Sequence, residues 1–198
     1  MTKIAIVTSS VRPGRQSLAV ANWVKSLADQ RDDATFEIVD IADFDLPAWQ
    51  EALNPKMGGP ESESGKAWTA RMGEFDAYIF AVAEYNHSLT GAFKNALDYL
   101  GPDQVANKAA AFVSYGSAGG ARAVEHLRGI LSELQIAHIR NNVLLSIFHD
   151  FENFSVLRPT EPAIAGVEPM LDQLLVWTRA MEAVRAGDFA LELIGARA

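Results

Sequence analysis

The stretch KIAIVTSSVRPGRQS, residues 3–17, determines how the rest of this chain is interpreted. Ile4 to Val7 form a short apolar run without polar alternation, which is typical of a parallel strand covered on both faces. Hydroxyl and guanidinium side chains follow, and Pro13 and Gly14 indicate a turn. From Leu18 to Leu27 apolar residues recur at helical spacing. We therefore predict a strand, a polar turn and a helix in succession.

This succession predicts an anion site at the start of the helix. A strand–turn–helix unit aims free backbone N–H groups and the positive helix end at one point, where phosphate binds well. Arg12 and Arg15 add guanidinium groups that match phosphate geometry, and no Asp or Glu occurs between Met1 and Lys25. The structural alternative is that these residues only cap the helix and form its turn.

Composition restricts the classes of function. The chain has 198 residues and a formal net charge of −8, so we expect one domain over 1–198 and no general nucleic-acid binding. It has no cysteine, which excludes disulfides, thiolate nucleophiles and zinc–sulfur sites. No apolar run approaches the length of a membrane span and no signal-peptide pattern is present. A cytoplasmic protein without membrane contact is expected.

Four more strands are predicted along the chain, and helical patterns separate them. The predicted strands cover 35–40, 76–83, 109–114 and 135–145. The predicted helices cover 66–74, 89–100 with Ser88 as its N-cap, 123–134 and 167–185. The stretches 41–65 and 146–166 are irregular, and 186–198 is weakly patterned. Strands that alternate with helices favour a doubly wound parallel sheet with right-handed crossovers.

The polar loops at 8–17, 83–88 and 114–120 all follow predicted strands. In a doubly wound sheet, ligands bind beyond the carboxyl ends of the strands, where the strand order reverses. The order 2-1-3-4-5 would place these three loops around one crevice. An anion cradle, an aromatic-bearing loop and a glycine-rich loop suit a ligand with a phosphate and a flat ring, and FMN fits. The absence of GxxxxGK[ST] excludes a P-loop NTPase, and the absence of GxGxxG weakens a dinucleotide-binding interpretation.

Three segments resemble motifs of the NADPH-dependent FMN reductases, a family of flavodoxin-like fold that includes quinone, azo-dye and chromate reductases. They are Ser9-Ser10-Val11-Arg12-Pro13-Gly14-Arg15, the sixteen residues AEYNHSLTGAFKNALD from Ala83 to Asp98, and Ser114-Tyr115-Gly116-Ser117-Ala118-Gly119-Gly120. The second motif is the most specific, and the resemblance covers roughly residues 3–145. It implies an α/β fold with a five-stranded parallel sheet of order 2-1-3-4-5.

The resemblance also implies which residues bind the cofactor. The FMN phosphate would be held by Ser10, Arg12, Arg15, Gln16 and Ser17. The flavin ring would be lined, largely through main-chain atoms, by Ala83, Glu84, Tyr85 and Asn86, and edged by Ser114, Tyr115, Gly116, Gly119 and Gly120. Ser9 stands where the family usually has Gly, and Ala83 where it usually has Pro. No catalytic side chain and no metal ligand is expected.

The activity implied by the resemblance is electron transfer from NADPH, or NADH, to bound FMN and then to a small-molecule acceptor. Two other classes stay open: an FMN-binding electron carrier without its own nicotinamide site, and a binding module that has lost its flavin. His87 could contact substrate or merely pack its loop. The phenylalanine-rich stretch 146–166 is hard to bury in one subunit, so we expect a homodimer or homotetramer in which this stretch forms a contact.

Overall fold

The computed structural model describes residues 1–188; residues 189–198, in the weakly patterned tail, lie outside the described part. A five-stranded sheet has the order β2-β1-β3-β4-β5, and every neighbouring pair is parallel, which confirms the predicted topology. The strands are β1 (Thr2–Thr8), β2 (Ala34–Val39), β3 (Ala77–Ala83), β4 (Ala109–Gly116) and β5 (Ala137–Ser146).

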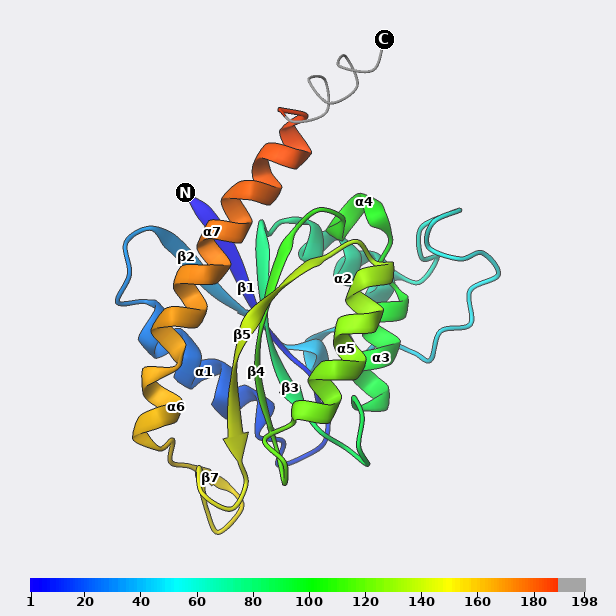
Figure 1. Cartoon of the computed structure of the whole chain (residues 1–198). Coiled ribbons are helices and arrows are strands. Elements are labelled where there is room, and N and C mark those ends of the chain that lie inside the picture. Colours follow the sequence, from blue (N-terminus) through cyan, green and yellow to red (C-terminus); the bar gives the residue numbers. More distant parts are fainter. Residues whose placement is uncertain (189–198) are drawn as a thin grey trace.

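Helices cover both faces of this sheet (Figure 1). One face carries α1 (Ser17–Ala28), α6 (Glu161–Ala165) and α7 (Val167–Ala186). The opposite face carries α2 (Glu63–Gly73), α3 (Gly91–Asp98), α4 (Pro102–Val105) and α5 (Ala121–Glu133). All seven residues of the central strand β3 are buried, because both of its faces lie under helices. This explains its unbroken apolar sequence.

The helix predicted for 89–100 begins later than expected. Its N-cap is Thr90, whose hydroxyl accepts a hydrogen bond from the backbone N–H of Phe93 at 3.0 Å. The prediction of Ser88 as N-cap was therefore wrong. The main chain of Ser88 instead pairs with that of Tyr85 through two hydrogen bonds of 3.0 and 3.1 Å, which closes a tight turn before the helix starts.

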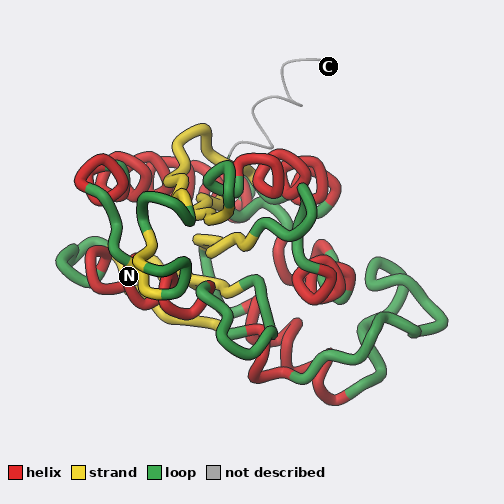
Figure 2. The backbone as a smooth tube through the Cα atoms, turned by 90° about the horizontal axis from the view of Figure 1, so that it is seen from below, coloured by secondary structure: helices red, strands yellow, loops and turns green. Residues whose placement is uncertain are grey.

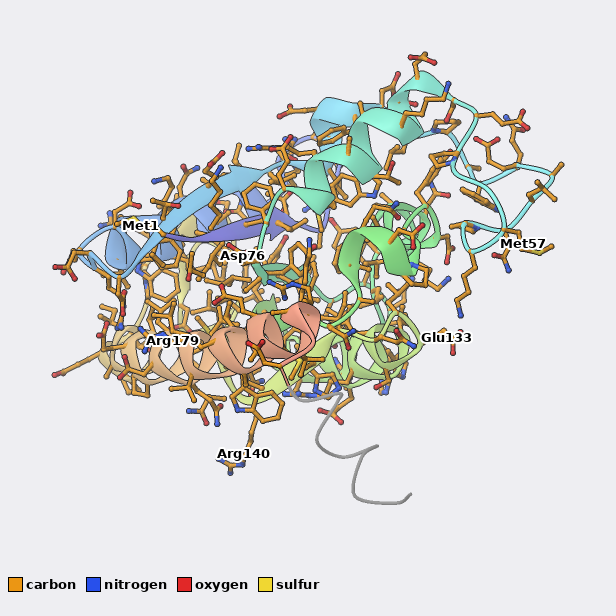
Figure 3. The ribbon with its side chains drawn as sticks, turned by 90° about the horizontal axis from the view of Figure 1, so that it is seen from above. Met1, Met57, Asp76, Glu133, Arg140 and Arg179 are labelled. Carbon is orange, nitrogen blue, oxygen red and sulfur yellow. The ribbon has the colours of Figure 1, made fainter. Side chains whose placement is uncertain are left out.

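The long irregular stretch after β2 is partly ordered by its neighbours. It begins with the short 3-10 helix η1 (Ile41–Phe44), and it ends where Ser62 caps α2. Asn95 on α3 accepts a hydrogen bond from the N–H of Trp49 at 2.8 Å and donates one to the carbonyl of Pro47 at 2.7 Å. Beyond this anchor the loop projects from the body of the molecule, with Met57 near its tip (Figure 3).

The phenylalanine-rich stretch contains a small hairpin, β6 (Phe151–Glu152) and β7 (Val156–Leu157). The buried Asp150 carboxylate fastens both ends of this segment, because it accepts hydrogen bonds from the N–H groups of Ser146 at 2.7 Å and Thr160 at 2.9 Å. Phe148 and Phe154 pack edge to face, yet 58% and 63% of their surface is exposed. The segment is thus a fastened projection that presents two aromatic rings.

The carboxyl ends of β1, β3 and β4 lie at the same end of the sheet, because the strands are parallel. The loops that leave these strands therefore come together there, at the bottom of Figure 1 and nearest the viewer in Figure 2. The predicted convergence of loops 8–17, 83–88 and 114–120 is confirmed. In the described part of the chain, no helix is long and apolar enough to cross a membrane.

Candidate functional site

The first loop connects β1 to the start of α1. The helix begins at Ser17 without a side-chain cap, and its first turn contains no acidic residue. The Ser17 side chain is fully buried, but its hydroxyl has no hydrogen-bond partner. Gln16 turns its amide back to the carbonyl of Gly14 at 3.3 Å. Free N–H groups, the positive helix end and an unsatisfied hydroxyl together make this position suited to an anion.

Arg12 and Ser10 meet the second loop through Tyr85. The Tyr85 hydroxyl lies 2.9 Å from the Ser10 hydroxyl and accepts a hydrogen bond from Arg12 Nε at 3.0 Å. The Arg12 guanidinium also lies 5.9 Å from the centre of the Tyr85 ring. The Tyr85 side chain therefore points toward the first loop and not into solvent.

Arg15 forms an ion pair with a residue that lies far from it in the sequence. Its Nη2 lies 2.6 Å from a carboxylate oxygen of Asp40, at the carboxyl end of β2. Burial raises the pKa of Asp40, but hydrogen bonds from Arg15, Thr8 and the N–H of Ala42 outweigh burial and lower it overall. The expectation that no acid opposes the anion holds only for residues 1–25, because the sheet brings Asp40 to the loop. Arg15 is thus engaged within the protein.

The second and third loops are joined by Glu84. Its side chain is 3% exposed, and its carboxylate pairs with the guanidinium of Arg122 and accepts the Arg122 N–H at 3.2 Å. The Glu84 N–H donates to the carbonyl of Tyr115 at 3.0 Å. The carboxylate therefore supplies the cap that the start of α5 otherwise lacks, since Gly120 has no side chain for this purpose.

The tip of the second loop is exposed and tightly turned. Asn86 and His87 both have positive φ angles, 47° and 73°, and both are exposed. The His87 ring centre lies 6.2 Å from that of His126, which in turn contacts the Ser88 hydroxyl at 2.8 Å. His87 is thus at the rim rather than packed inside the loop. Within residues 1–188, no group of three metal-ligating side chains is assembled.

The glycines of the third loop allow close packing inside the protein. A Cβ added to Gly119 would lie 2.8 Å from Leu144 Cβ, and one added to Gly120 would lie 2.7 Å from Ser114 Cβ. Both glycines also have positive φ angles, 67° and 77°. The Ser114 hydroxyl donates to the carbonyl of Gly119 at 2.7 Å. These glycines are therefore required by the packing of the loop itself, independently of any ligand that approaches the loop.

The two positions that depart from the family motifs meet each other. Ser9 is fully buried, and its hydroxyl accepts a hydrogen bond from the N–H of Ala83 at 2.8 Å. A proline at 83 would have no N–H, and a glycine at 9 would have no hydroxyl. The pair therefore satisfies a buried donor that exists only because alanine stands at 83. The first and second loops are locked together at this point.

Tyr115 adds a second unsatisfied hydroxyl to the site. Its side chain is 7% exposed, and its hydroxyl has no hydrogen-bond partner. Burial raises the pKa of this phenol, and Tyr85 raises it further, whereas Ser17 and Arg12 lower it. Ser17 lies beside the phenol, but the two hydroxyls do not meet with hydrogen-bonding geometry. Two buried hydroxyls without partners beside an arginine and a helix start fit a phosphate group, so the residues present suit FMN.

The fold and this site define a class: flavodoxin-like α/β proteins, with the crevice at the carboxyl ends of the strands. The enzyme FerB of Paracoccus denitrificans, a flavoenzyme NAD(P)H:(acceptor) oxidoreductase, has this fold with a TM-score of 0.71 and 19% identity, over 91% of this chain and 99% of that one. Flavodoxin 1 of Bacillus cereus matches with a TM-score of 0.54 and 15% identity, over 88% of this chain and 97% of that one.

The chain belongs to the NADPH-dependent FMN reductase family, whose pattern matches residues 2–150. It is 40% identical over 129 residues to the NAD(P)H-dependent FMN reductase ntnL of Nectria sp.. That alignment covers 62% of this chain and 64% of the relative, a little under two thirds of its length. It is 31% identical over 187 residues to the 2-hydroxy-1,4-benzoquinone reductase of a Burkholderia species, covering 89% of this chain and 96% of the relative.

Several residues that shape the site were not found from the sequence. Asp40 directly follows β2. Because β1 and β2 are adjacent and parallel, this position could have indicated that Asp40 lies close to the first loop. Arg122 follows the glycine-rich loop by two positions, but its pairing with Glu84 needs β3 and β4 to be adjacent. Thr90 could have been found by its position three residues before Phe93, the spacing of a helix cap.

Proposed function

We propose that this protein is an FMN-dependent oxidoreductase that takes hydride from NADPH or NADH onto bound FMN and then reduces a flavin, a quinone or a similar small molecule. The observation that carries the proposal is the meeting of three loops around buried, unpartnered hydroxyls at the start of α1. Family membership supports it further, as do relatives named for FMN and quinone reduction.

We propose the following roles for the predicted residues. Ser10, Arg12, Gln16 and Ser17 surround the phosphate, while Arg15 steadies the loop through Asp40. The main chain of 83–86 and of 114–120 borders the ring. FMN supplies the redox chemistry when it is bound. The protein orients the reactants and excludes water, so no side chain is assigned as a general acid or base.

We further propose a single domain over residues 1–198 that works in the cytoplasm as a homodimer or homotetramer. A chain without cysteine needs no oxidising compartment for its fold. The fastened projection with Phe148 and Phe154 is the proposed contact between copies, because solvent-exposed aromatic pairs favour protein interfaces. The partners are small-molecule acceptors, and the net charge of −8 argues against nucleic acid.

The decisive experiment reconstitutes the purified protein with FMN and follows NADPH and NADH oxidation with a quinone or free flavin as acceptor. We expect oxidation that requires bound FMN and that saturates with the nucleotide. A yellow protein that oxidises neither nucleotide unless a partner reductase is added would instead be an electron carrier. A protein that takes up no FMN would contradict the proposal as a whole.

The variant Arg12→Ala tests the phosphate assignment. Hydrogen bonds to charged groups contribute about 1.5–3 kcal/mol each, so FMN affinity should fall roughly ten- to a hundredfold. Arg140→Ala is the matched control, because Arg140 lies exposed on β5, away from the three loops. Flavin-fluorescence titration measures both. Equal affinities for the two variants would count against the assignment.

A further inference from the structure

A groove lies along the edge of the sheet, outside the three loops that form the crevice. It opens over the edge strand β5, and its walls come from α5 on one face of the sheet and α7 on the other. Figure 1 shows β5 between these two helices. The groove has a volume of about 850 Å³, which is ample for a small organic molecule. The residues that line it include none from the loops 8–17, 83–88 and 114–120.

Side chains already occupy backbone groups at this edge of the sheet. Arg128 donates through Nη1 to the carbonyl of Ile139 at 2.8 Å and through Nη2 to that of Arg140 at 3.3 Å. Gln173 accepts the N–H of Asn141 through its amide oxygen at 3.0 Å. The pairing of β5 with β4 is also irregular at this point. An added peptide strand would find these groups taken, so the groove is suited to a small molecule.

The ring of His138 offers a hydrogen-bond donor to the groove. Arg128 Nη1 lies 2.9 Å from His138 Nδ1, and because a guanidinium can only donate, Nδ1 is the acceptor. Burial lowers the pKa of His138, and the charge of Arg128 lowers it further, so the ring is neutral at neutral pH. The ring proton is therefore on Nε2. This N–H forms no hydrogen bond within residues 1–188, and the side chain lines the groove.

The groove also has an excess of positive charge. Glu125, the acid among its lining residues, pairs with Arg128 at 3.2 Å. Arg140 is exposed and forms no ion pair within the described part of the chain, and its side chain projects from the body of the molecule (Figure 3). One positive charge is therefore left over, although the whole chain has a formal net charge of −8. This local charge favours an anionic ligand.

An aromatic wall completes the groove. Trp177 on α7 lines it, and 40% of the surface of this large side chain is exposed. An indole offers a flat apolar face on which another ring can stack. The groove thus combines an exposed aromatic face with an unpaired cation, and a ligand that satisfies both needs a ring and an anionic group.

We propose that this groove binds a small aromatic carboxylate, with the ring against Trp177 and the carboxylate at Arg140 and the His138 Nε2–H. His138 and Arg140 share a face of β5, because the buried Ile139 lies between them. A guanidinium can bind a carboxylate through two parallel hydrogen bonds, so Arg140 matches it in shape as well as in charge. This site goes beyond the proposed oxidoreductase function, because it requires neither flavin nor nicotinamide.

The test titrates the FMN-loaded protein with salicylate, and with uncharged salicylamide as the matched probe, by isothermal calorimetry. We expect saturable binding of salicylate and roughly tenfold weaker binding of salicylamide. Arg140→Ala should weaken salicylate binding roughly tenfold and leave salicylamide unchanged. Trp177→Ala should weaken both, whereas Trp177→Phe keeps a ring and should retain most of the affinity. Arg179→Ala is the control, because this exposed arginine lies on α7 but does not line the groove.

A second series of titrations separates the groove from the crevice. The FMN-free protein should bind salicylate with the same affinity, because the groove shares no residue with the three loops. Binding that FMN abolishes or strongly alters would place salicylate in the crevice and overturn the inference. Equal salicylate affinity in the wild type and Arg140→Ala would also overturn it, as would the absence of saturable binding at millimolar salicylate. A protein that takes up no FMN would contradict only the proposed function.

Discussion

Single residues decide how the first two loops are held together, and Ser9 with Ala83 is the clearest case. The hydrogen bond from the Ala83 N–H to the Ser9 hydroxyl is fully buried. Leaving a buried donor without a partner costs about 1–3 kcal/mol. The two residues therefore depend on each other, although 74 positions separate them.

Ser9→Ala should lower the free energy of unfolding by about 1–3 kcal/mol, because the Ala83 N–H would lose its acceptor. In the Ala83→Pro background, which lacks this N–H, the same change should cost clearly less. Urea unfolding of the two single variants and the double variant measures the coupling. If Ser9→Ala costs the same in both backgrounds, the hydrogen bond does not contribute as described.

At the scale of elements, the ion pair of Glu84 and Arg122 connects the loop after β3 to the start of α5. The carboxylate is almost fully buried, while the guanidinium is 38% exposed and can still reach water. Removing the carboxylate therefore costs the cap of α5 and the link between the two loops, rather than leaving a wholly buried cation.

Glu84→Gln should lower the free energy of unfolding by about 1–3 kcal/mol and also weaken flavin binding, because both loops that we propose to border the ring would shift. Glu125→Gln is the control, since this exposed acid lies on the same helix and only pairs with Arg128 at 3.2 Å. Chemical unfolding and flavin titration measure the two effects. A loss no greater than that of the control would show that the link is dispensable.

A lysine immediately before β4 donates a hydrogen bond to the carboxyl end of α2. Lys108 is 7% exposed, and its ammonium donates to the carbonyl of Gly73 at 2.9 Å. Burial lowers the pKa of Lys108 from 10.5 to about 8. The unfolded chain therefore holds more protons than the folded protein between pH 8 and 10.5, so this group makes stability rise with pH in that window.

We expect the free energy of unfolding of the wild type, minus that of Lys108→Met, to increase from pH 8 to pH 10. The subtraction removes the contribution of groups shared by both proteins. Urea unfolding at a series of pH values measures the difference. A difference that stays flat or falls over this range would contradict the lowered pKa of Lys108.

At the scale of the whole molecule, the proposed homodimer or homotetramer depends on the projection that carries Phe148 and Phe154. The exposed rings of Phe148 and Phe154 lie on a segment that Asp150 fastens at both ends. A fastened segment loses little conformational entropy when it binds, which favours its use as a contact.

The double variant Phe148→Ser, Phe154→Ser should sediment as a monomer at micromolar concentration, where the wild type should sediment as a dimer or tetramer. Val176→Ser is the control, because Val176 is 64% exposed on α7 and lies outside the fastened segment. Analytical ultracentrifugation measures all three proteins. A wild type that is monomeric and fully active would remove this contact from the proposal.

The sequence by itself determined the alternation of strands and helices, and its resemblance to a known family implied the strand order. Local patterns carry the alternation, because an unbroken apolar run such as Ala77–Ala83, bounded by polar residues, is typical of a strand covered on both faces. The three polar loops were also visible, since each directly follows such a run. The order 2-1-3-4-5 then places them at one end of the sheet.

Only the tertiary structure decided which side chains meet inside those loops. Asp40 reaches Arg15, Arg122 reaches Glu84, and Ser9 reaches Ala83 across separations that no local pattern records. Hydrogen bonds and ion pairs act over a few ångströms, so they depend on strand adjacency and register rather than on spacing along the chain. For the same reason, the unpartnered hydroxyls of Ser17 and Tyr115 became visible only once the sheet had brought α1 and β4 together.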